Sequence, residues 1–209
     1  MELPNYNLFL GTIYQNQIMR KLVLLIIVVL SFTGVASAQK NEIGIKLGYS
    51  LIKPNDYDPG TIFGLSYTRY FTNTIGMGVT LNGFTYNVRG LEDNLINTFD
   101  GIHVASRFHL ADDLLFTAKF GIGIYTCSYP EFTILFENGS TLDVPEMNPY
   151  AIGYMINAGL RYDITERFGI GLNLDYIGSG SLEFKAFGID LAEEEQQSIN
   201  ITLATTFRF

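Results

Sequence analysis

The chain has 209 residues and a formal net charge of −8, which suits one acidic domain and disfavours nucleic acid as a partner, because phosphate binding needs a basic surface. Hydrophobic residues make up 47% of the chain, phenylalanine and tyrosine are frequent, and tryptophan is absent. Cys127 is the single cysteine, so an internal disulfide is excluded and the secondary structure itself must hold the fold.

The first recognisable pattern in chain order is a short apolar run with a basic start. A basic pair at 20–21 precedes the apolar stretch 22–30, and small residues follow at 36–38. This order is typical of a secretory signal peptide, and the run is too short for a spanning helix, which needs about 20 residues. The alternative is an uncleaved anchor with a cytoplasmic tail. We expect a misassigned extension over 1–18, a signal peptide over 19–38 and a mature domain over 39–209.

The mature domain holds 11 Lys and Arg against 20 Asp and Glu, and none of its apolar runs approaches the length of a spanning helix. Eight of its segments instead alternate apolar and polar residues, as strands do when one face lies in hydrocarbon and the other in a polar interior. Tight turns and long loops alternate between them, as in membrane barrels. The segments are 43–50, 63–71, 75–88, 102–110, 116–125, 150–162, 168–176 and 199–209, and the long loops are 51–60, 89–99, 129–148 and 178–197.

The third segment contains a break in the alternation. Its apolar side runs from Ile75 to Leu81, slips at Gly83 and resumes with Phe84 and Tyr86. A slip at glycine indicates a β-bulge, so we expect both rings on the lipid-facing side. The outward aromatic residues then form two girdles around an aliphatic band. They are Phe71, Phe108, Phe116, Tyr162, Phe168, Phe207 and Phe209 near the tight turns, and Tyr49, Phe63, Tyr86, Tyr150, Tyr154 and Tyr176 near the long loops.

The last segment ends its apolar row with Phe207 and Phe209. It resembles the terminal strand of bacterial outer-membrane barrels, whose final aromatic residue is the signal that the barrel-assembly machinery reads. Together with the leader, the eight segments and the turn and strand over 163–171, the chain resembles the small eight-stranded barrels. These are the OmpA transmembrane domain, OmpX, OmpW-like proteins and the Bacteroidetes-type "outer membrane protein β-barrel" family.

The resemblance implies an all-β fold: an eight-stranded antiparallel up-and-down transmembrane β-barrel, preceded by a cleavable signal peptide. It also implies a place in the bacterial outer membrane with both termini in the periplasm. The partners that it implies are outer-membrane lipid, lipopolysaccharide and, during insertion, the barrel-assembly machinery.

The barrel interior is predicted to hold many charges. Eight strands leave an interior only wide enough for side chains, so inward charges must be paired or hydrated. We favour a structural network of salt bridges and water over a polar conduit or a proton-sensitive gate. Glu42 and Arg208 lie inward at the same end of the first and last strands, so we expect them to pair. The predicted lumen network is Glu42, Lys46, His103, Arg107, Lys119, Arg161, Asp163, Asp175 and Arg208, with His109 also inward.

The sequence offers no convincing catalytic or metal-binding set. His103 and Ser106 lie three residues apart on one strand and therefore face opposite sides, which argues against a nucleophile and base pair. The two histidines lack a third ligand at a suitable spacing. We expect no catalytic residue, no metal and no cofactor.

The third and fourth long loops combine length with apolar content. Asn138 and Gly139 between two β-prone runs predict a hairpin in the third loop. We interpret the acidic run 193–195 in the fourth as a solvated face, with divalent cations bridging to lipopolysaccharide as the alternative. The apolar residues either pack on one another above the membrane or form a recognition surface. The candidate recognition residues are Phe132, Ile134, Phe136, Leu182, Phe184, Phe187 and Ile189.

These features predict a non-enzymatic outer-membrane barrel that presents its loops in a structural, adhesion or interaction role, with a surface protein or a hydrophobic ligand as its partner. The alternative is a narrow porin-like or OmpW-like barrel for uptake of hydrophobic small molecules. A soluble lipocalin-like barrel is disfavoured, because such barrels place their apolar faces inside.

Overall fold

The structure, a computed structural model, describes residues 41–53, 58–87, 94–135, 139–187 and 189–209. The chain divides into two units, Met1–Ala38 and Gln39–Phe209, and all the described residues lie in the second. The expected extension over 1–18 and signal peptide over 19–38 therefore lie outside the described residues. Within the described ranges, no helix is long and apolar enough to cross a membrane.

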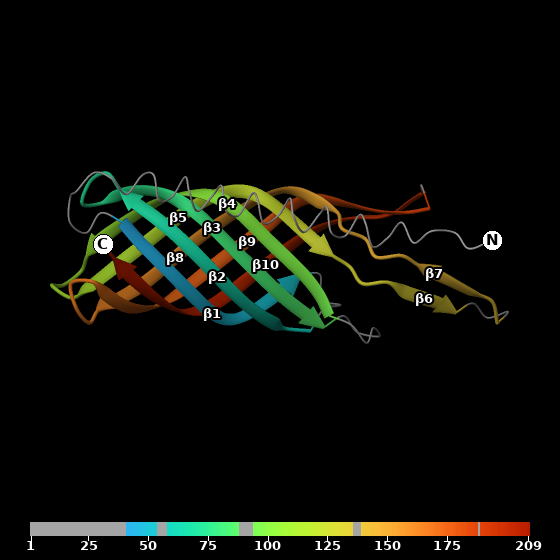
Figure 1. Cartoon of the computed structure of the whole chain (residues 1–209), viewed down its shortest axis with the longest axis horizontal. Coiled ribbons are helices and arrows are strands. Elements are labelled where there is room, and N and C mark those ends of the chain that lie inside the picture. The colour runs from blue at the N-terminus through green and yellow to red at the C-terminus, as the bar shows by residue number, and fades with distance from the viewer. Residues whose placement is uncertain (1–40, 54–57, 88–93, 136–138, 188) are drawn as a thin grey trace, which may run out of the picture. The chain divides into compact units, whose positions relative to one another are not determined.

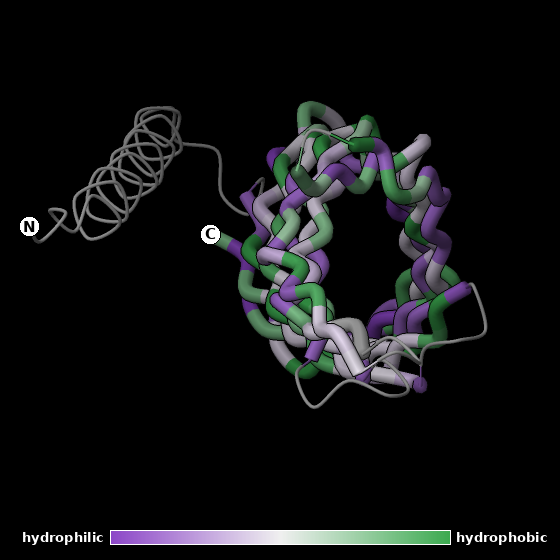
Figure 2. Tube along the Cα trace, turned by 90° about the vertical axis from the view of Figure 1, so that its right-hand side faces the viewer, coloured by the Kyte–Doolittle hydropathy of each residue, from purple (hydrophilic) through white to green (hydrophobic). Residues whose placement is uncertain are grey.

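Eight long strands close into a barrel, which Figure 1 shows from the side and Figure 2 shows end-on. Every strand pairs antiparallel with its neighbours, and β1 closes the ring by pairing with β10. This confirms the predicted all-β, eight-stranded antiparallel barrel. The barrel strands are β1 (Asn41–Lys53), β2 (Gly60–Tyr70), β3 (Ile75–Asn87), β4 (Asn94–His109), β5 (Leu114–Ser128), β8 (Tyr150–Asp163), β9 (Phe168–Ala186) and β10 (Ile189–Arg208).

The two remaining strands form the hairpin predicted in the third long loop. β6 (Phe132–Leu135) pairs antiparallel with β7 (Thr141–Val144), and they make a separate two-stranded sheet. Gly139 between them has a φ of +81°, a conformation that glycine adopts at no steric cost. The hairpin prediction is therefore confirmed.

The two ends of the barrel are built differently. At one end, the turns after β2 and β8 are tight because a threonine in each accepts a backbone hydrogen bond: Thr72 Oγ1 from Ile75 N at 2.8 Å, and Thr165 Oγ1 from Phe168 N at 3.0 Å. At the other end β9 and β10 continue as paired strands well beyond the barrel (Figure 1). The predicted loop over 178–197 is therefore wrong for most of its length. The β9–β10 hairpin holds it instead, with register shifts between Asp190 and Ala192 and between Glu195 and Gln197.

An apolar band surrounds the barrel on the side of the tight turns. On β5 the outward apolar side chains run from Phe116 to Ile124, about nine residues, which is close to the length that a tilted strand needs to cross hydrocarbon. Such a band is stable only against lipid, because in water it would be a very large exposed apolar patch. Its aliphatic members include Ile45, Leu47, Leu65, Met77, Ile102, Val104, Ile122, Ile156, Leu160, Leu172, Leu174, Ile201 and Leu203.

Beyond this band the two faces of the strands exchange their chemistry. Many outward positions become polar, at Lys53, Thr61, Thr85, Thr98, Asp100, Thr126 and Gln197, although Ile96 and Tyr150 are also exposed at this level. Inward positions become apolar and fully packed, at Ile52, Ile62, Phe84, Tyr86, Leu95, Phe99, Tyr125, Cys127, Met155 and Ile177. We call this second set the apolar cap. Within the band, the barrel has polar side chains inside and apolar side chains outside. Above the band, where water surrounds the wall, it has an apolar interior like that of a water-soluble protein.

The exchange explains why the predicted bulge at Gly83 is wrong. β2 and β3 pair without a register shift, from Thr61 opposite Thr85 through Phe63 opposite Gly83. Gly83 simply continues the outward row, with open space around its Cβ position. Phe84 then points into the apolar cap, as does Tyr86, which leaves the predicted upper girdle. The other predicted girdle residues are exposed or partly exposed on the outer face.

Candidate functional site: the lumen and the hairpins above it

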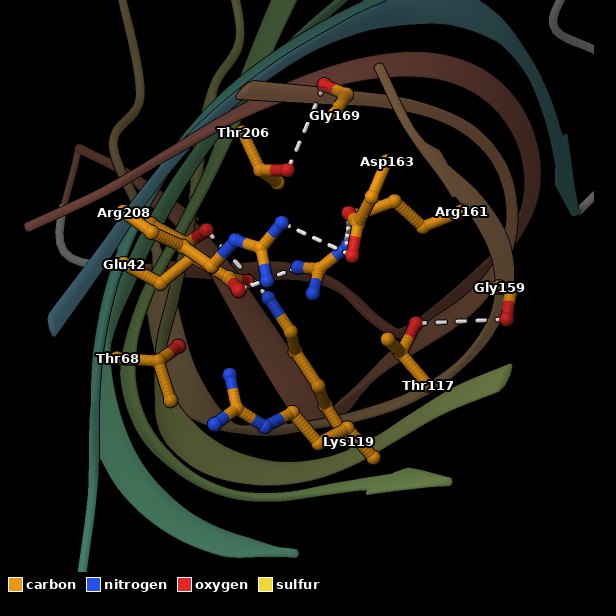
Figure 3. A network of polar contacts seen from close by, with 12 residues as sticks. Glu42, Thr68, Thr117, Lys119, Gly159, Arg161, Asp163, Gly169, Thr206 and Arg208 are labelled. Atoms are coloured by element: carbon orange, nitrogen blue, oxygen red, sulfur yellow. Dashed lines mark hydrogen bonds and ion pairs between the residues drawn. The ribbon is translucent and has the colours of Figure 1, made fainter. Parts of the chain in front are cut away.

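A chain of ion pairs crosses the lumen near the tight turns, and Figure 3 shows it from close by. The Glu42 carboxylate of β1 pairs with the Arg161 guanidinium of β8. Arg161 Nε lies 3.1 Å from Asp163 Oδ1, and Arg208 Nη2 lies 2.9 Å from Asp163 Oδ2. Arg208 Nη2 also donates to the Thr165 carbonyl oxygen at 3.3 Å. These contacts connect three strands and a tight turn through buried charges.

A second ionic group lies around Asp175 of β9, which is fully buried. Lys46 Nζ lies 3.0 Å from Asp175 Oδ1. Asn157 Nδ2 donates to the same oxygen at 2.8 Å, and Thr202 Oγ1 lies 3.4 Å from Asp175 Oδ2. A buried carboxylate is tolerated only with such partners, so a lysine, an amide and a hydroxyl together hold it in place.

Two further lumen residues have partners other than carboxylates. His103 Nε2 lies 2.9 Å from Thr68 Oγ1, and the histidine is almost fully buried. Arg107 stacks its guanidinium on the Tyr70 ring, with Cζ 3.9 Å from the ring centroid, an attractive cation–π geometry.

All nine residues of the predicted lumen network have contacts on the inner face of the barrel, and His109 is exposed. The predicted pairing of Glu42 with Arg208 is wrong, although the two are register partners on β1 and β10. Neighbouring strands bring the two backbones together, but each side chain extends across the ring. The Glu42 carboxylate therefore reaches Arg161, and the Arg208 guanidinium is taken by Asp163.

Uncharged polar groups lie beside the apolar cap and hydrogen-bond to its edge. Ser50 Oγ lies 2.5 Å from Tyr86 Oη and also bonds to the Asn200 side chain. Asn200 Nδ2 in turn donates to Ser198 Oγ at 3.2 Å. Tyr86 thus has its ring in the cap and its hydroxyl among these polar groups, which suits an amphipathic side chain at a boundary.

Gln196 is a lumen residue that the sequence analysis missed. It lies at the β10 bulge between Glu195 and Gln197, is fully buried, and accepts a hydrogen bond from Asn97 Nδ2 at 2.6 Å. Its backbone N–H donates to Ser179 Oγ at 3.0 Å. The bulge turns this side chain inward, and the only sequence signal is the loss of alternation beside an acidic run.

The predicted recognition residues fall into two groups. Leu182 and Phe184 are buried, and the Phe184 ring packs edge-on against Tyr129 with centroids 6.0 Å apart. Phe132 is half-buried against the same ring. Phe187 and Ile189 are exposed at the tip of the β9–β10 hairpin. Phe136 lies outside the described residues, as does the side chain of Ile134.

The two hairpins are strongly acidic. Their described residues within 127–149 and 179–196 include eight carboxylates and one lysine. That lysine, Lys185, lies 2.6 Å from Glu183 and 3.4 Å from Asp190, and hydrogen bonds to these two carboxylates raise its pKa. The remaining carboxylates give this end of the barrel a negative field that would attract cationic groups.

Chemically, the described lumen holds its carboxylates in ion pairs with lysine and arginine side chains. The described histidine inside it is bonded to a threonine hydroxyl. Among the described residues, no group of three His, Cys, Asp or Glu side chains is placed to hold a metal ion. The apolar cap lies between the ionic groups and the long-loop end, so water meets a dry layer there.

Comparison with known proteins supports the architecture. No model of a protein family matches the sequence, and no curated protein matches it. Among solved structures, Neisserial surface protein A has a TM-score of 0.61 at 12% identity, over 83% of this chain and 100% of that one. Ail, the attachment invasion locus protein of Yersinia pestis, has a TM-score of 0.50 at 17% identity, over 83% and 100%. The chain therefore has the fold of the small outer-membrane β-barrels.

The corrected ion pairs generate a test by double-mutant cycles. We expect strong coupling between Glu42→Gln and Arg161→Met, because removing one partner leaves the other charge buried, at a cost of about 3–5 kcal/mol. The pair Glu42→Gln and Arg208→Met should couple much more weakly. The measurement is the free energy of unfolding by urea for the barrel folded in lipid vesicles. Equal coupling in the two cycles, or stronger coupling to Arg208, would contradict the assignment.

Proposed function

We propose that this protein is a non-enzymatic outer-membrane barrel that anchors two acidic hairpins outside the cell for recognition of a cationic partner. The termini and tight turns would then lie in the periplasm, as the signal peptide predicted from the sequence implies. Phe207 and Phe209, whose rings stack with centroids 6.2 Å apart on the outer face, would serve as the signal for the barrel-assembly machinery.

The observation that carries the proposal is the apolar cap. Transport through the barrel would require a wet path, yet the cap packs fully buried rings at its centre, with Phe84 6.2 Å from Tyr86 and 6.3 Å from Tyr125 between ring centroids. Below it, buried charges are tied in ion pairs that ions would have to break. A closed barrel that spans the membrane and extends past it is suited to holding a surface structure, and it is poorly suited to uptake.

The chemistry of the partner follows from the hairpins. Like charge makes lipopolysaccharide phosphates and a second copy of this chain poor partners for eight carboxylates and one lysine. A cationic polypeptide is complementary, and the exposed Phe187, Ile189 and Leu191 at the hairpin tip add apolar contact area. Divalent cations bridging to lipopolysaccharide would be a competing use of the same carboxylates.

Binding to defined polyions tests this surface. The barrel in nanodiscs should bind poly-lysine with an affinity that falls as salt rises, and it should not bind heparin. The triple variant Glu183→Gln, Glu193→Gln, Glu195→Gln should bind poly-lysine about tenfold more weakly, since three exposed charge pairs together contribute roughly 1–2 kcal/mol.

The matched control is a triple variant at the opposite end, Asp112→Asn, Asp113→Asn, Glu166→Gln, which should bind as wild type does. Equal weakening in both variants, or equal binding of heparin, would contradict recognition by the hairpins. Binding of lipopolysaccharide that a chelator abolishes would favour the divalent-cation bridge instead.

Conductance across a planar bilayer tests the closed lumen. The wild-type barrel should give no discrete current steps, because the apolar cap excludes water from the path. Reproducible single-channel steps whose number rises with the amount of protein would favour the narrow uptake barrel and contradict the proposal.

A further inference from the structure

The charges inside the barrel do not balance. The described lumen residues include three carboxylates, Glu42, Asp163 and Asp175, against five cationic side chains, Lys46, Arg107, Lys119, Arg161 and Arg208. All three carboxylates already have ion-pair partners. A charge removed from bulk water needs a counter-charge or hydration, so the two remaining cations require an explanation.

The two remaining cations lie in different settings. Arg107 is near the tight turns, where it stacks on Tyr70 and its Nε donates to the Asn73 carbonyl oxygen at 2.9 Å. Lys119 lies deeper, and Figure 3 shows its side chain extending from β5 toward the centre of the ring. Its Nζ donates a long hydrogen bond of 3.5 Å to Ser66 Oγ. Among the described residues, no carboxylate lies within ion-pair distance of this nitrogen.

A cavity of about 50 Å³ borders this lysine. Its wall also contains the cationic groups of Lys46 and Arg161, and hydroxyl groups such as those of Ser66 and Thr117 that can donate hydrogen bonds. Arg161 is almost fully buried, and its Nη2 has no hydrogen-bond partner. Glu42 and Asp175 also border the cavity, which leaves one net positive charge on its wall.

We propose that this cavity binds one small inorganic anion of the halide class, with chloride as the physiological candidate. The anion would accept hydrogen bonds from Lys119 Nζ and Arg161 Nη2, and it would cancel the net charge of the wall. The volume admits a halide with one or two waters, because a water occupies roughly 10–15 Å³ of such space. A six-carbon gluconate ion is too large for it. The anion acts as a structural counter-ion beneath the apolar cap.

The test is the salt dependence of unfolding. The temperature at which the folded, heat-modifiable barrel is lost in detergent should rise with sodium chloride or bromide and then saturate, as expected for a ligand of the folded state. Sodium gluconate at equal ionic strength should give no such rise. Lys119→Met should lose the halide response, whereas the exposed control Lys185→Met should keep it.

A second measurement stands even if Lys119→Met does not fold. Crystals of the wild-type barrel soaked in bromide should show an anomalous peak in contact with Lys119 Nζ. Identical unfolding in sodium chloride, bromide and gluconate would overturn the proposal, as would a wild-type halide response in Lys119→Met. Bromide peaks on the outer surface alone would mean an adventitious ion only, and would overturn it as well.

Discussion

The environment of the outward strand face is the constraint on which the rest of the structure depends. A β-strand shows alternate residues to opposite sides, and strands such as β4 keep that phase from the apolar band into the part above it. Over the band the outer face meets hydrocarbon, so apolar residues lie outside and polar residues inside. Beyond the band the outer face meets water, and the same phase requires the reverse. β4 carries both states, with Val104 outward and His103 inward below, and Asp100 outward and Phe99 inward above.

The layers of the interior follow from this exchange. Charged side chains can lie only in the lower lumen, where a narrow ring forces them to pair across it, as Glu42 does with Arg161. Amides and hydroxyls lie beside the apolar cap, whose buried side chains fill the top. The apolar cap therefore closes the lumen at the long-loop end. The strands that continue upward share a water-excluding core with the β6–β7 hairpin through residues such as Val144 and Phe184. The exposed chemistry of the protein is therefore concentrated on the hairpins.

The features that could be predicted from the sequence are those that depend on a local residue pattern within a single environment. Period-two alternation located all eight barrel strands, and Asn138 and Gly139 located the hairpin. The sequence prediction failed at Gly83 and Phe84, because it assumed that lipid surrounds the whole strand. The apolar residues change from the outer to the inner face there, and the prediction took this change for a bulge, although the strand register is unbroken. It failed for the partner of Glu42, because pairing across a ring depends on strand stagger, which no local pattern contains. Gln196 was missed for a related reason, since a bulge inside an expected loop directs it inward.

The exchange of faces can be measured directly with spin labels along β4. Single cysteines placed at outward positions 94, 98, 102 and 104, in a Cys127→Ala background, would be labelled in the barrel reconstituted into bilayers. The account predicts that oxygen, which concentrates in hydrocarbon, relaxes the labels at 102 and 104, and that a water-soluble nickel complex relaxes those at 94 and 98. Oxygen dominance through position 94, or nickel access at 104, would contradict a membrane surface at the level where the strands exchange their chemistry.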